Sequence, residues 1–311
     1  MFRFLMGVSA ASALTLLCVT GANCAKPGQP PSPRKPVRVA LRASTSRPGR
    51  IEAALLQSTG VKVEIVEFAG SRASIEGLRR GSTELAVVTS DASYLAFTGQ
   101  LDESVAPFDK LRGIAVVNMD TLHLMVGKNN PSNSISDLRG SKVSLGPPTS
   151  ATALVSELLL NAHGLTLDDI KGERLANGEA AKQLITGKVD AAFLPLVAPN
   201  AIATEAARGG ARLLEIEGPL VEQLRLQHPF LVRTLLPHGT YPGQQKAIRT
   251  IGVDLLLVCR ADLDDTLVYS FLQAYFAPGT TTATDLDRAT AVSIPLHRAA
   301  SHYYRERELS R

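Results

Sequence analysis

Short apolar runs alternate with amphipathic stretches along most of the chain. Runs with the character of strands lie at 37–41, 61–68, 85–88, 111–117, 122–126, 143–145, 191–196, 211–216, 231–236 and 251–258. Segments with apolar residues at helical spacing lie between them, at 51–56, 75–80, 92–97, 153–163, 179–185, 199–207, 221–226 and 267–276. This alternation predicts an α/β fold with mostly parallel sheets, and the 311 residues fit two such sheets better than one.

The sharpest of these transitions is the turn Gly146-Pro147-Pro148, which ends an apolar run and precedes four small residues. Three of those four carry hydroxyl groups, and an amphipathic segment follows up to His163. Hydroxyl side chains at a helix start accept hydrogen bonds from unpaired backbone N–H groups. The N–H groups that remain, together with the helix dipole, favour an anion. The turn is therefore a candidate anion site, with an ordinary helix cap as the alternative.

Similar polar residues follow other predicted strands. Ligands of open α/β sheets bind beyond the carboxyl ends of the strands, so hydroxyl-rich ends that converge would suit a small polar ligand. The candidate ligand-binding residues at these ends are Arg42, Ser44, Thr45, Ser90, Asp91, Thr149, Ser150 and Thr152. Tyr241 is a further candidate, because it lies in a Gly- and Pro-rich turn, where a large aromatic ring either packs at a hinge or covers a ligand.

The N-terminal segment predicts export. No charged residue lies between Arg3 and Lys26, and an apolar centre is followed by small residues, as in a secretory signal peptide. We therefore expect a signal peptide at 1–25, a Pro-rich linker at 26–36 and a periplasmic location. An uncleaved membrane anchor is the alternative. Lipid attachment at Cys24 is weakly supported, because Asn23 fits a lipidation motif poorly.

The composition is that of an ordinary globular protein, with 45% hydrophobic and 20% charged residues. The net charge of +4 is spread along the chain and there is no Trp, so we expect no nucleic-acid binding. Cys259 lies in an apolar run, which predicts a buried core residue.

The sequence contains no recognisable catalytic or metal-binding motif. The six His residues are dispersed without a metal-ligand pair, and neither a G-x-S-x-G elbow nor a phosphate-binding loop is present. We therefore expect no catalytic residue, no metal and no cofactor. A Ser-His-Asp site assembled from distant segments is the alternative, and it would make the protein a secreted hydrolase.

Five segments, at 84–91, 143–152, 187–193, 237–244 and 258–263, follow a common pattern in the same order along the chain. They resemble the TAXI family, the solute-binding subunits of tripartite ATP-independent periplasmic (TRAP) transporters. The segment Gly-Thr-Tyr-Pro-Gly-Gln at 239–244 and the Gly-Pro-Pro turn are the most specific parts of the resemblance. The tail with Tyr303 and Tyr304 extends it to about residue 305.

The resemblance implies a periplasmic binding fold of type II, in which two α/β lobes joined by crossing strands close over a ligand. Lobe I would comprise 37–121 plus about 282–311, and lobe II about 122–281. The implied ligand is a small carboxylate or amino acid, which would be delivered to the TRAP membrane permease subunits, and a monomer is expected. A ligand-binding sensor or a surface antigen without a transport role is the alternative.

Two loops depart from the family pattern. Where the family usually has a Thr-Gly-Gly loop and a Gly-Ser-Gly-Thr turn, this chain has the loop at 42–49 and the turn at 149–152. The family's glycines, which let backbone N–H groups approach a ligand closely, are missing or fewer there. One hypothesis is that Arg42 or Arg47 binds a ligand carboxylate in place of those donors. The other is that both arginines are ordinary surface charges.

Overall fold

The computed structural model describes residues 36–41, 48–60, 62–101, 104–148, 150–279 and 287–309, and Pro36–Arg311 form one compact unit. The predicted signal peptide at 1–25 and the linker up to Lys35 lie outside the described residues. In the described ranges, no helix has both the length and the apolar character required to cross a bilayer.

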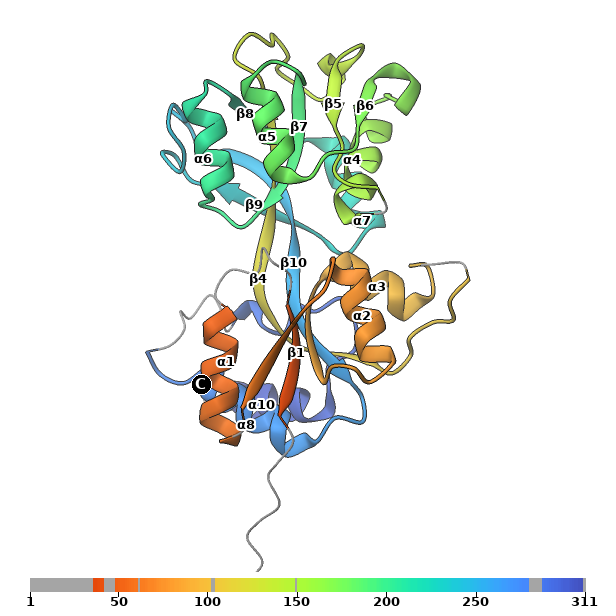
Figure 1. Ribbon diagram of the computed structural model, residues 1–311, viewed down its shortest axis with the longest axis vertical. Helices are drawn as coiled ribbons and strands as arrows, with labels where there is room; N and C mark the ends of the chain where they lie inside the picture. Colours follow the sequence, from red (N-terminus) through yellow and green to blue (C-terminus); the bar gives the residue numbers. More distant parts are fainter. Residues whose placement is uncertain are drawn as a thin grey trace, which may run out of the picture. The chain divides into compact units, whose positions relative to one another are not determined.

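One hydrogen-bonded sheet runs through the described part of the chain (Figure 1). Its ten strands are β1 (Val37–Leu41), β2 (Val63–Glu67), β3 (Leu85–Thr89), β4 (Leu111–Val126), β5 (Lys142–Ser144), β6 (Lys171–Glu173), β7 (Ala191–Leu196), β8 (Arg212–Leu214), β9 (Leu231–Leu236) and β10 (Ile248–Arg260). They follow the order β2-β1-β3-β10-β4-β7-β5-β6, with β8 paired to β4 and β9 paired to β10. β1 is parallel to β2 and β3, and β5 is parallel to β6 and β7, so both ends of the sheet are parallel as predicted.

The two longest strands, β4 and β10, cross from one half of the sheet to the other. They are antiparallel to each other, and β3 and β7 join them antiparallel on either side. The predicted runs at 111–117 and 122–126 both belong to β4, because the polar stretch 118–121 between them keeps pairing with β10. In place of two separate sheets, the chain therefore forms two parallel halves joined by an antiparallel pair.

Helices cover both halves of this sheet (Figure 1). We call the half with β1–β3 lobe I and the half with β5–β7 lobe II. Lobe I carries α1 (Pro48–Thr59), α2 (Ser71–Arg79), α3 (Ser90–Thr98), α8 (Asp265–Tyr275) and α10 (Arg298–Leu309), and lobe II carries α4 (Ala151–Ala162), α5 (Asn177–Ile185), α6 (Ala201–Arg208) and α7 (Pro219–Gln227). Short 3-10 turns lie at Ser136–Leu138 and Leu167–Asp169.

The position of α8 corrects one predicted lobe boundary. This helix lies within 122–281, the range predicted for lobe II, but it packs against α1 and α10 in lobe I. The chain therefore returns to lobe I along β10, because that strand pairs with β9 at its start and with β3 towards its end. The other predicted boundaries stay predictions.

Apolar clusters cover both faces of each half-sheet. In lobe I, Leu255 and Leu257 of β10 belong to the cluster with α1, α8 and α10, whereas Leu256 and Val258 belong to the cluster with α2 and α3. Side chains of a strand alternate between its two faces, so a continuous apolar run is expected for a strand that is covered on both sides. Cys259 is fully buried in the first cluster, which confirms its predicted core position.

The turn at Gly146 leaves no room for a side chain. Gly146 has a φ of +86°, and a Cβ atom there would lie 2.5 Å from the Cβ of Thr152. We expect Gly146→Ala to lower the free energy of unfolding by about 1–3 kcal/mol, because the methyl group overpacks this contact in an unfavourable backbone conformation. Gly178→Ala is the matched control, since an added Cβ at Gly178 in α5 meets nothing within 4 Å. Urea unfolding compares the two variants, and equal stabilities would contradict the expectation.

Candidate functional site

One strand end and one helix start that the sequence singled out lie at a small cavity between the two lobes. Thr89 ends β3 and Thr152 lies in the first turn of α4, and both line a cavity of about 50 Å³ together with Asp120 of β4 and Val253 of β10. A water molecule occupies about 30 Å³ of the liquid. The cavity therefore has no room for an organic ligand in this conformation, although it joins residues of both lobes and of the crossing strands.

The hydroxyl groups of two predicted ligand-binding residues already have hydrogen-bond partners. Ser150 is the N-cap of α4: its Oγ accepts from the backbone N–H of Ala153 at 3.1 Å and donates to the carbonyl oxygen of Pro147 at 2.7 Å. Ser90 Oγ donates to the carbonyl oxygen of Phe230 at 3.4 Å. These contacts give both residues structural roles, and a contact with a ligand stays a prediction for each.

The other predicted residues divide into two groups. Asp91 is 1% exposed in the first turn of α3, and Thr152 is 8% exposed at the small cavity between the lobes. Arg42, Ser44, Thr45 and Thr149, as well as Arg47, lie outside the described residues, so their predicted roles stay predictions.

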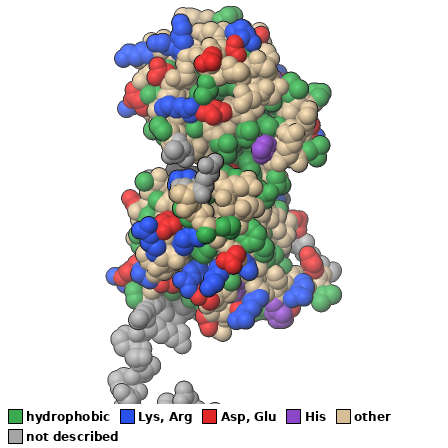
Figure 2. All heavy atoms as spheres, turned by 90° about the vertical axis from the view of Figure 1, so that its right-hand side faces the viewer, with side chains coloured by type: hydrophobic (Ala, Val, Ile, Leu, Met, Phe, Trp, Pro, Cys, Tyr) green, Lys and Arg blue, Asp and Glu red, His purple; other side chains and the backbone are tan. Residues whose placement is uncertain are grey.

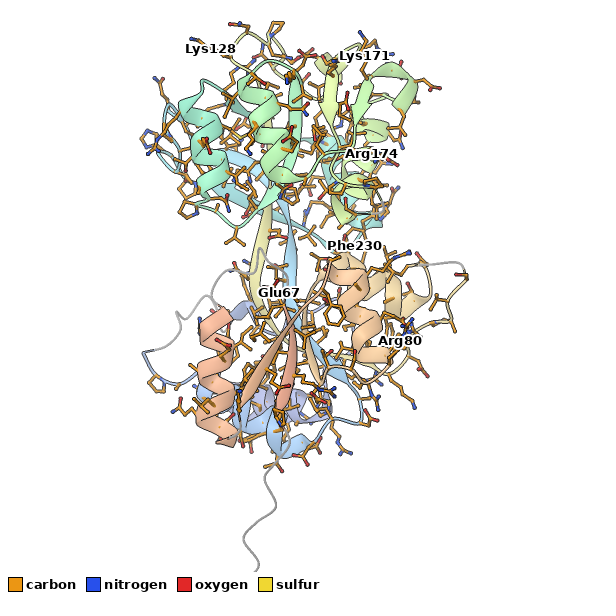
Figure 3. All side chains as sticks on the ribbon, in the orientation of Figure 1. Glu67, Arg80, Lys128, Lys171, Arg174 and Phe230 are labelled. Atoms are coloured by element: carbon orange, nitrogen blue, oxygen red, sulfur yellow. The ribbon has the colours of Figure 1, made fainter. Side chains whose placement is uncertain are left out.

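An aromatic contact links the lobes beside α3. Phe230 precedes β9 in lobe II, and its ring centroid lies 6.1 Å from that of Tyr94 on α3 of lobe I. Figure 3 shows Phe230 beside the end of α3 at which Ser90 donates to its carbonyl group. Because Phe230 is 2% exposed and packs in the core of lobe II, this contact couples the lobe II core to the start of α3.

Tyr241 lies in the core of lobe II. It is 3% exposed, and its hydroxyl group lies 2.8 Å from Nε2 of His123. Nδ1 of His123 faces the carbonyl oxygens of Thr121 and Leu194, at 2.8 and 3.2 Å. A ring nitrogen between two carbonyl groups must carry the proton, so Nδ1 donates and Nε2 accepts from Tyr241. Of the two roles weighed for Tyr241, the burial favours packing, and a ligand contact stays a prediction.

Burial also sets the protonation of this pair. Desolvation lowers the pKa of His123 to about 4, although hydrogen bonds to the backbone of Thr121 and Leu194 act in the opposite direction. Desolvation likewise raises the pKa of Tyr241 to about 12. Both side chains are therefore neutral near pH 7, which fits a structural hydrogen bond inside the lobe.

A larger hollow lies on the hinge, and we call it the hinge hollow. It has a volume of about 370 Å³ and is lined by Arg50, Tyr275, Phe276 and Arg288 from lobe I, by 116–119 of β4 and by 197–199 of lobe II. An adjoining hollow of about 340 Å³ shares 118–119, 197–199 and Arg288 with it and extends to Thr234 of β9. Both lobes and a crossing strand therefore contribute to this region, as a site that responds to closure requires.

The two arginines of the hinge hollow are held differently. Arg50 Nη2 donates to the carbonyl oxygen of Tyr275 at 3.1 Å, and its guanidinium carbon lies 4.2 Å from the centroid of the Tyr275 ring. Arg288 forms an ion pair with Asp254 of β10, whose side chain is 3% exposed. Burial raises the pKa of Asp254, and the charge of Arg288 opposes that rise.

Sequence reasoning missed Arg50, Arg288 and Asp254. No local pattern marks them, since Arg50 belongs to an ordinary amphipathic helix and Asp254 interrupts an apolar run. Asp254 carried the only usable signal, because a charged residue inside a buried strand requires a partner.

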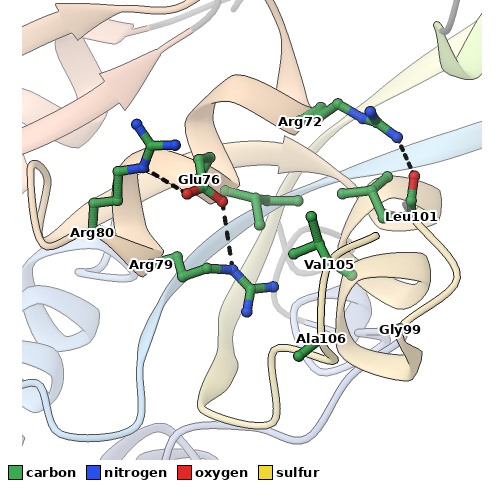
Figure 4. A pocket seen from close by; sticks show the side chains of 10 residues that line it. Arg72, Glu76, Arg79, Arg80, Gly99, Leu101, Val105 and Ala106 are labelled. Carbon is green, nitrogen blue, oxygen red and sulfur yellow. Dashed lines mark hydrogen bonds and ion pairs between the residues drawn. The ribbon is translucent and has the colours of Figure 1, made fainter. Parts of the chain in front are cut away.

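The outer face of lobe I has a separate hollow of about 280 Å³ between α2 and α3 (Figure 4). Figure 2 shows this side of the molecule, with Lys and Arg side chains grouped on lobe I. Glu76 accepts a hydrogen bond from Arg80 Nε at 2.7 Å and lies 3.5 Å from Arg79 Nε, and Arg72 donates to the carbonyl oxygen of Leu101. Because residues of one lobe alone line this hollow, a ligand there would not couple to movement of the lobes.

Two solved structures of similar fold are sulfonate-binding proteins. The chain is similar to the periplasmic aliphatic sulphonate-binding protein SsuA from Escherichia coli, with 17% identity and a TM-score of 0.50 over 89% of this chain and 76% of that one. It is also similar to the alkanesulfonate-binding protein SsuA from Xanthomonas axonopodis pv. citri bound to MOPS, with 16% identity and a TM-score of 0.51 over 86% and 83%. The predicted periplasmic binding fold of type II is thereby confirmed.

A match to a sequence model assigns the chain to a protein family. The sequence model of the NMT1-like family matches residues 49–307, and the protein belongs to this family. The narrower resemblance to the TAXI subunits of TRAP transporters stays a prediction.

The buried His123 predicts a pH dependence of stability. Its pKa is about 4 in the folded protein and about 6.5 in an unfolded chain, so between these values the unfolded state binds more protons. The contribution of His123 to the free energy of unfolding is therefore fully present above pH 6.5. It is lost as the pH drops towards 4, and the total loss is about 3 kcal/mol. We expect urea unfolding at pH 7.5 and 4.5 to show this loss in the natural protein and a loss smaller by about that amount in His123→Gln.

Other titrating groups, including His228 and His297, whose pKa values burial also lowers, are common to both proteins and cancel in the comparison. The same pH dependence in the two proteins would show that His123 is solvated in the folded state.

Proposed function

We propose that this protein is an extracytoplasmic solute receptor, which binds a small carboxylate or amino-acid-like solute between its lobes and delivers it to a membrane permease. The observation that carries the proposal is the hinge hollow, to which lobe I contributes Arg50 and Arg288 and lobe II contributes 197–199. A ligand that contacts both lobes at once is bound best when they are closed. Its binding therefore shifts the population towards the closed state, the change that a permease can recognise.

The charges of the site support an anionic solute. A guanidinium group offers a planar set of donors that matches a carboxylate, and such charge-assisted hydrogen bonds are stronger than neutral ones. An affinity near 1 μM requires about 8 kcal/mol of binding free energy. Two charged contacts together with burial of the solute between the lobes are sufficient for that.

Binding is favoured over catalysis. His123 receives the Tyr241 hydroxyl hydrogen bond inside lobe II and lines neither of the two hinge hollows. A hydrolase of the Ser-His-Asp type would require a histidine that faces the cleft and accepts a proton from a serine, and His123 does neither. The alternative of a sensor without a transport role uses the same ligand site and differs only in its partner.

The TAXI resemblance supports a TRAP permease as the partner, and the signal-peptide pattern supports a periplasmic location. The two SsuA proteins of similar fold are sulfonate-binding proteins, so an alkanesulfonate is the second candidate solute. A carboxylate and a sulfonate share a single negative charge on acceptor oxygens, which makes both suitable for arginine.

A thermal-shift screen of residues 26–311 tests the receptor function. The panel contains carboxylates, amino acids, keto acids and alkanesulfonates, with the corresponding amides and alcohols as uncharged controls. At about a hundred times its dissociation constant, a ligand adds roughly 2.7 kcal/mol and raises the unfolding midpoint by roughly 5–10 °C. We expect one class of anion to raise the unfolding midpoint and its uncharged controls to leave it unchanged. A flat response across the panel would reject the proposed function.

The contact between Tyr94 and Phe230 predicts a further effect on binding. If closure brings these rings together, Tyr94→Ala removes an aromatic contact of about 0.5–1.5 kcal/mol from the closed form. We expect the affinity for the ligand from the screen to fall by about twofold to tenfold, measured by calorimetry. Tyr94→Phe, which keeps the ring, is the control. An unchanged affinity of Tyr94→Ala would show that the two rings meet equally in the open and the closed protein.

A further inference from the structure

We infer that the hinge hollow selects an organic monoanion with an apolar body, and that Arg50 is the residue that fixes its charged group. This inference rests on the proposed receptor function and narrows its solute class. Four observations carry it: the fixed position of Arg50, the ion pair of Arg288, the apolar residues in the lining and the volume of the hollow.

Arg50 is a fixed cation that forms no ion pair among the described residues. The carbonyl oxygen of Tyr275 and the face of its ring hold the guanidinium group in one place, at 3.1 Å from the carbonyl and 4.2 Å from the ring centroid. Within the described residues, no carboxylate forms an ion pair with it. A guanidinium group has five N–H donors, so one hydrogen bond to Tyr275 leaves donors for a ligand. A pre-positioned cation loses little side-chain entropy when it binds an anion.

Arg288 contributes a cation whose charge is balanced. Asp254 is almost fully buried and forms an ion pair with Arg288, whose own side chain is 40% exposed and lines the hollow. The charges of the two arginines and this aspartate sum to +1. A monoanion would neutralise this net charge of the three side chains, whereas a dianion would leave one negative charge without a partner among them.

Six apolar residues line part of the hollow, and the polar Asn118 lies among them. The apolar residues are Val116, Val117 and Met119 of β4 and Val197, Ala198 and Pro199 of the segment after β7. Among the described lining residues none is acidic, and the nearby Asp254 is bound to Arg288. An ammonium group would therefore lack an anionic partner here, and this disfavours an amino acid.

The volume also fits a solute with an apolar body. At about 370 Å³, the hollow falls within the range of about 300–1,000 Å³ that is usual for organic ligands. Burying each methylene group against the walls strengthens binding by about fourfold. We therefore expect affinity to rise with chain length in a series of linear carboxylates until the hollow is filled.

Isothermal titration calorimetry with matched probes tests the inference. The probes are butanoate, hexanoate, hexane-1-sulfonate, hexanamide, hexylamine and glutamate. For the natural protein we expect hexanoate and hexane-1-sulfonate to bind at least tenfold more tightly than hexanamide, hexylamine or glutamate, and hexanoate to bind more tightly than butanoate. Comparable binding of hexanamide or hexylamine would overturn the inference without the use of any variant.

Variants then locate the charged group. We expect Arg50→Gln to weaken hexanoate binding at least tenfold and to leave the weak binding of hexanamide unchanged. Arg249→Gln is the matched control, because Arg249 is 68% exposed and is bound to Glu217 away from the hollow. The double variant Arg288→Gln with Asp254→Asn removes the second cation without leaving a buried aspartate alone, and it should weaken hexanoate binding less than Arg50→Gln does.

The outcomes separate the two proposals. Glutamate or another polar solute could bind tightly, with the same affinity for Arg50→Gln as for the Arg249→Gln control. That result would support the receptor function and reject the hinge hollow as the binding site. If neither these probes nor the broader screen gives binding, both proposals fall. Circular dichroism of each variant confirms that a lost affinity is not a lost fold.

Discussion

The antiparallel pairing of β4 and β10 is the constraint on which the rest of the structure depends. This pair is the only ladder that continues through both lobes in the described residues, and every other strand joins it directly or through one or two intervening strands. Its register shifts near Leu255 and Leu257, where irregular pairing increases the local twist. The approach is also close, since a Cβ at Gly252 would lie 2.4 Å from Sδ of Met119. Any movement of the lobes must therefore be absorbed by this ribbon.

The same ribbon explains where polar groups are tolerated. A buried strand normally excludes charge, because an unpaired carboxylate loses its hydration without compensation. Asp254 nevertheless lies in the middle of β10, and the ion pair with Arg288 compensates it at the wall of the hinge hollow. A buried ion pair rarely adds much stability compared with an apolar pair of the same volume. Its position beside a hollow lined by both lobes therefore favours a role in binding over a role in stability.

Local features of the fold followed from the sequence, and non-local ones did not. The strands at 37–41 and 231–236, the turn at Gly146 and the cap at Ser150 have signatures within a few residues, and the structure contains each of them. The split of β4 into two runs was wrong. Asn118 and Thr121 line the hollows and Asp120 lines the small cavity, so these residues can be polar within a strand. The lobe of α8 was misassigned for a different reason. The lobe that a helix joins depends on the lobe in which the long strand β10 ends. The hydrophobic periodicity of the sequence does not indicate this position.

The site was predicted less well than the fold, and hydroxyl groups show why. Ser90 and Ser150 lie at helix starts, where a hydroxyl group that could bind a ligand has the same sequence pattern as one that bonds to the backbone. In the structure both groups have backbone partners. Arg50, Asp254 and Arg288 come from distant parts of the chain. Arg50 and Arg288 line one hollow, and Asp254 reaches Arg288 because β10 returns to lobe I. The segments 42–48 and 149–152 contain no glycine that would let backbone N–H groups approach an anion. Recognition of an anion by arginine side chains, which reach a ligand without requiring a special backbone conformation, is the solution that this combination of residues favours.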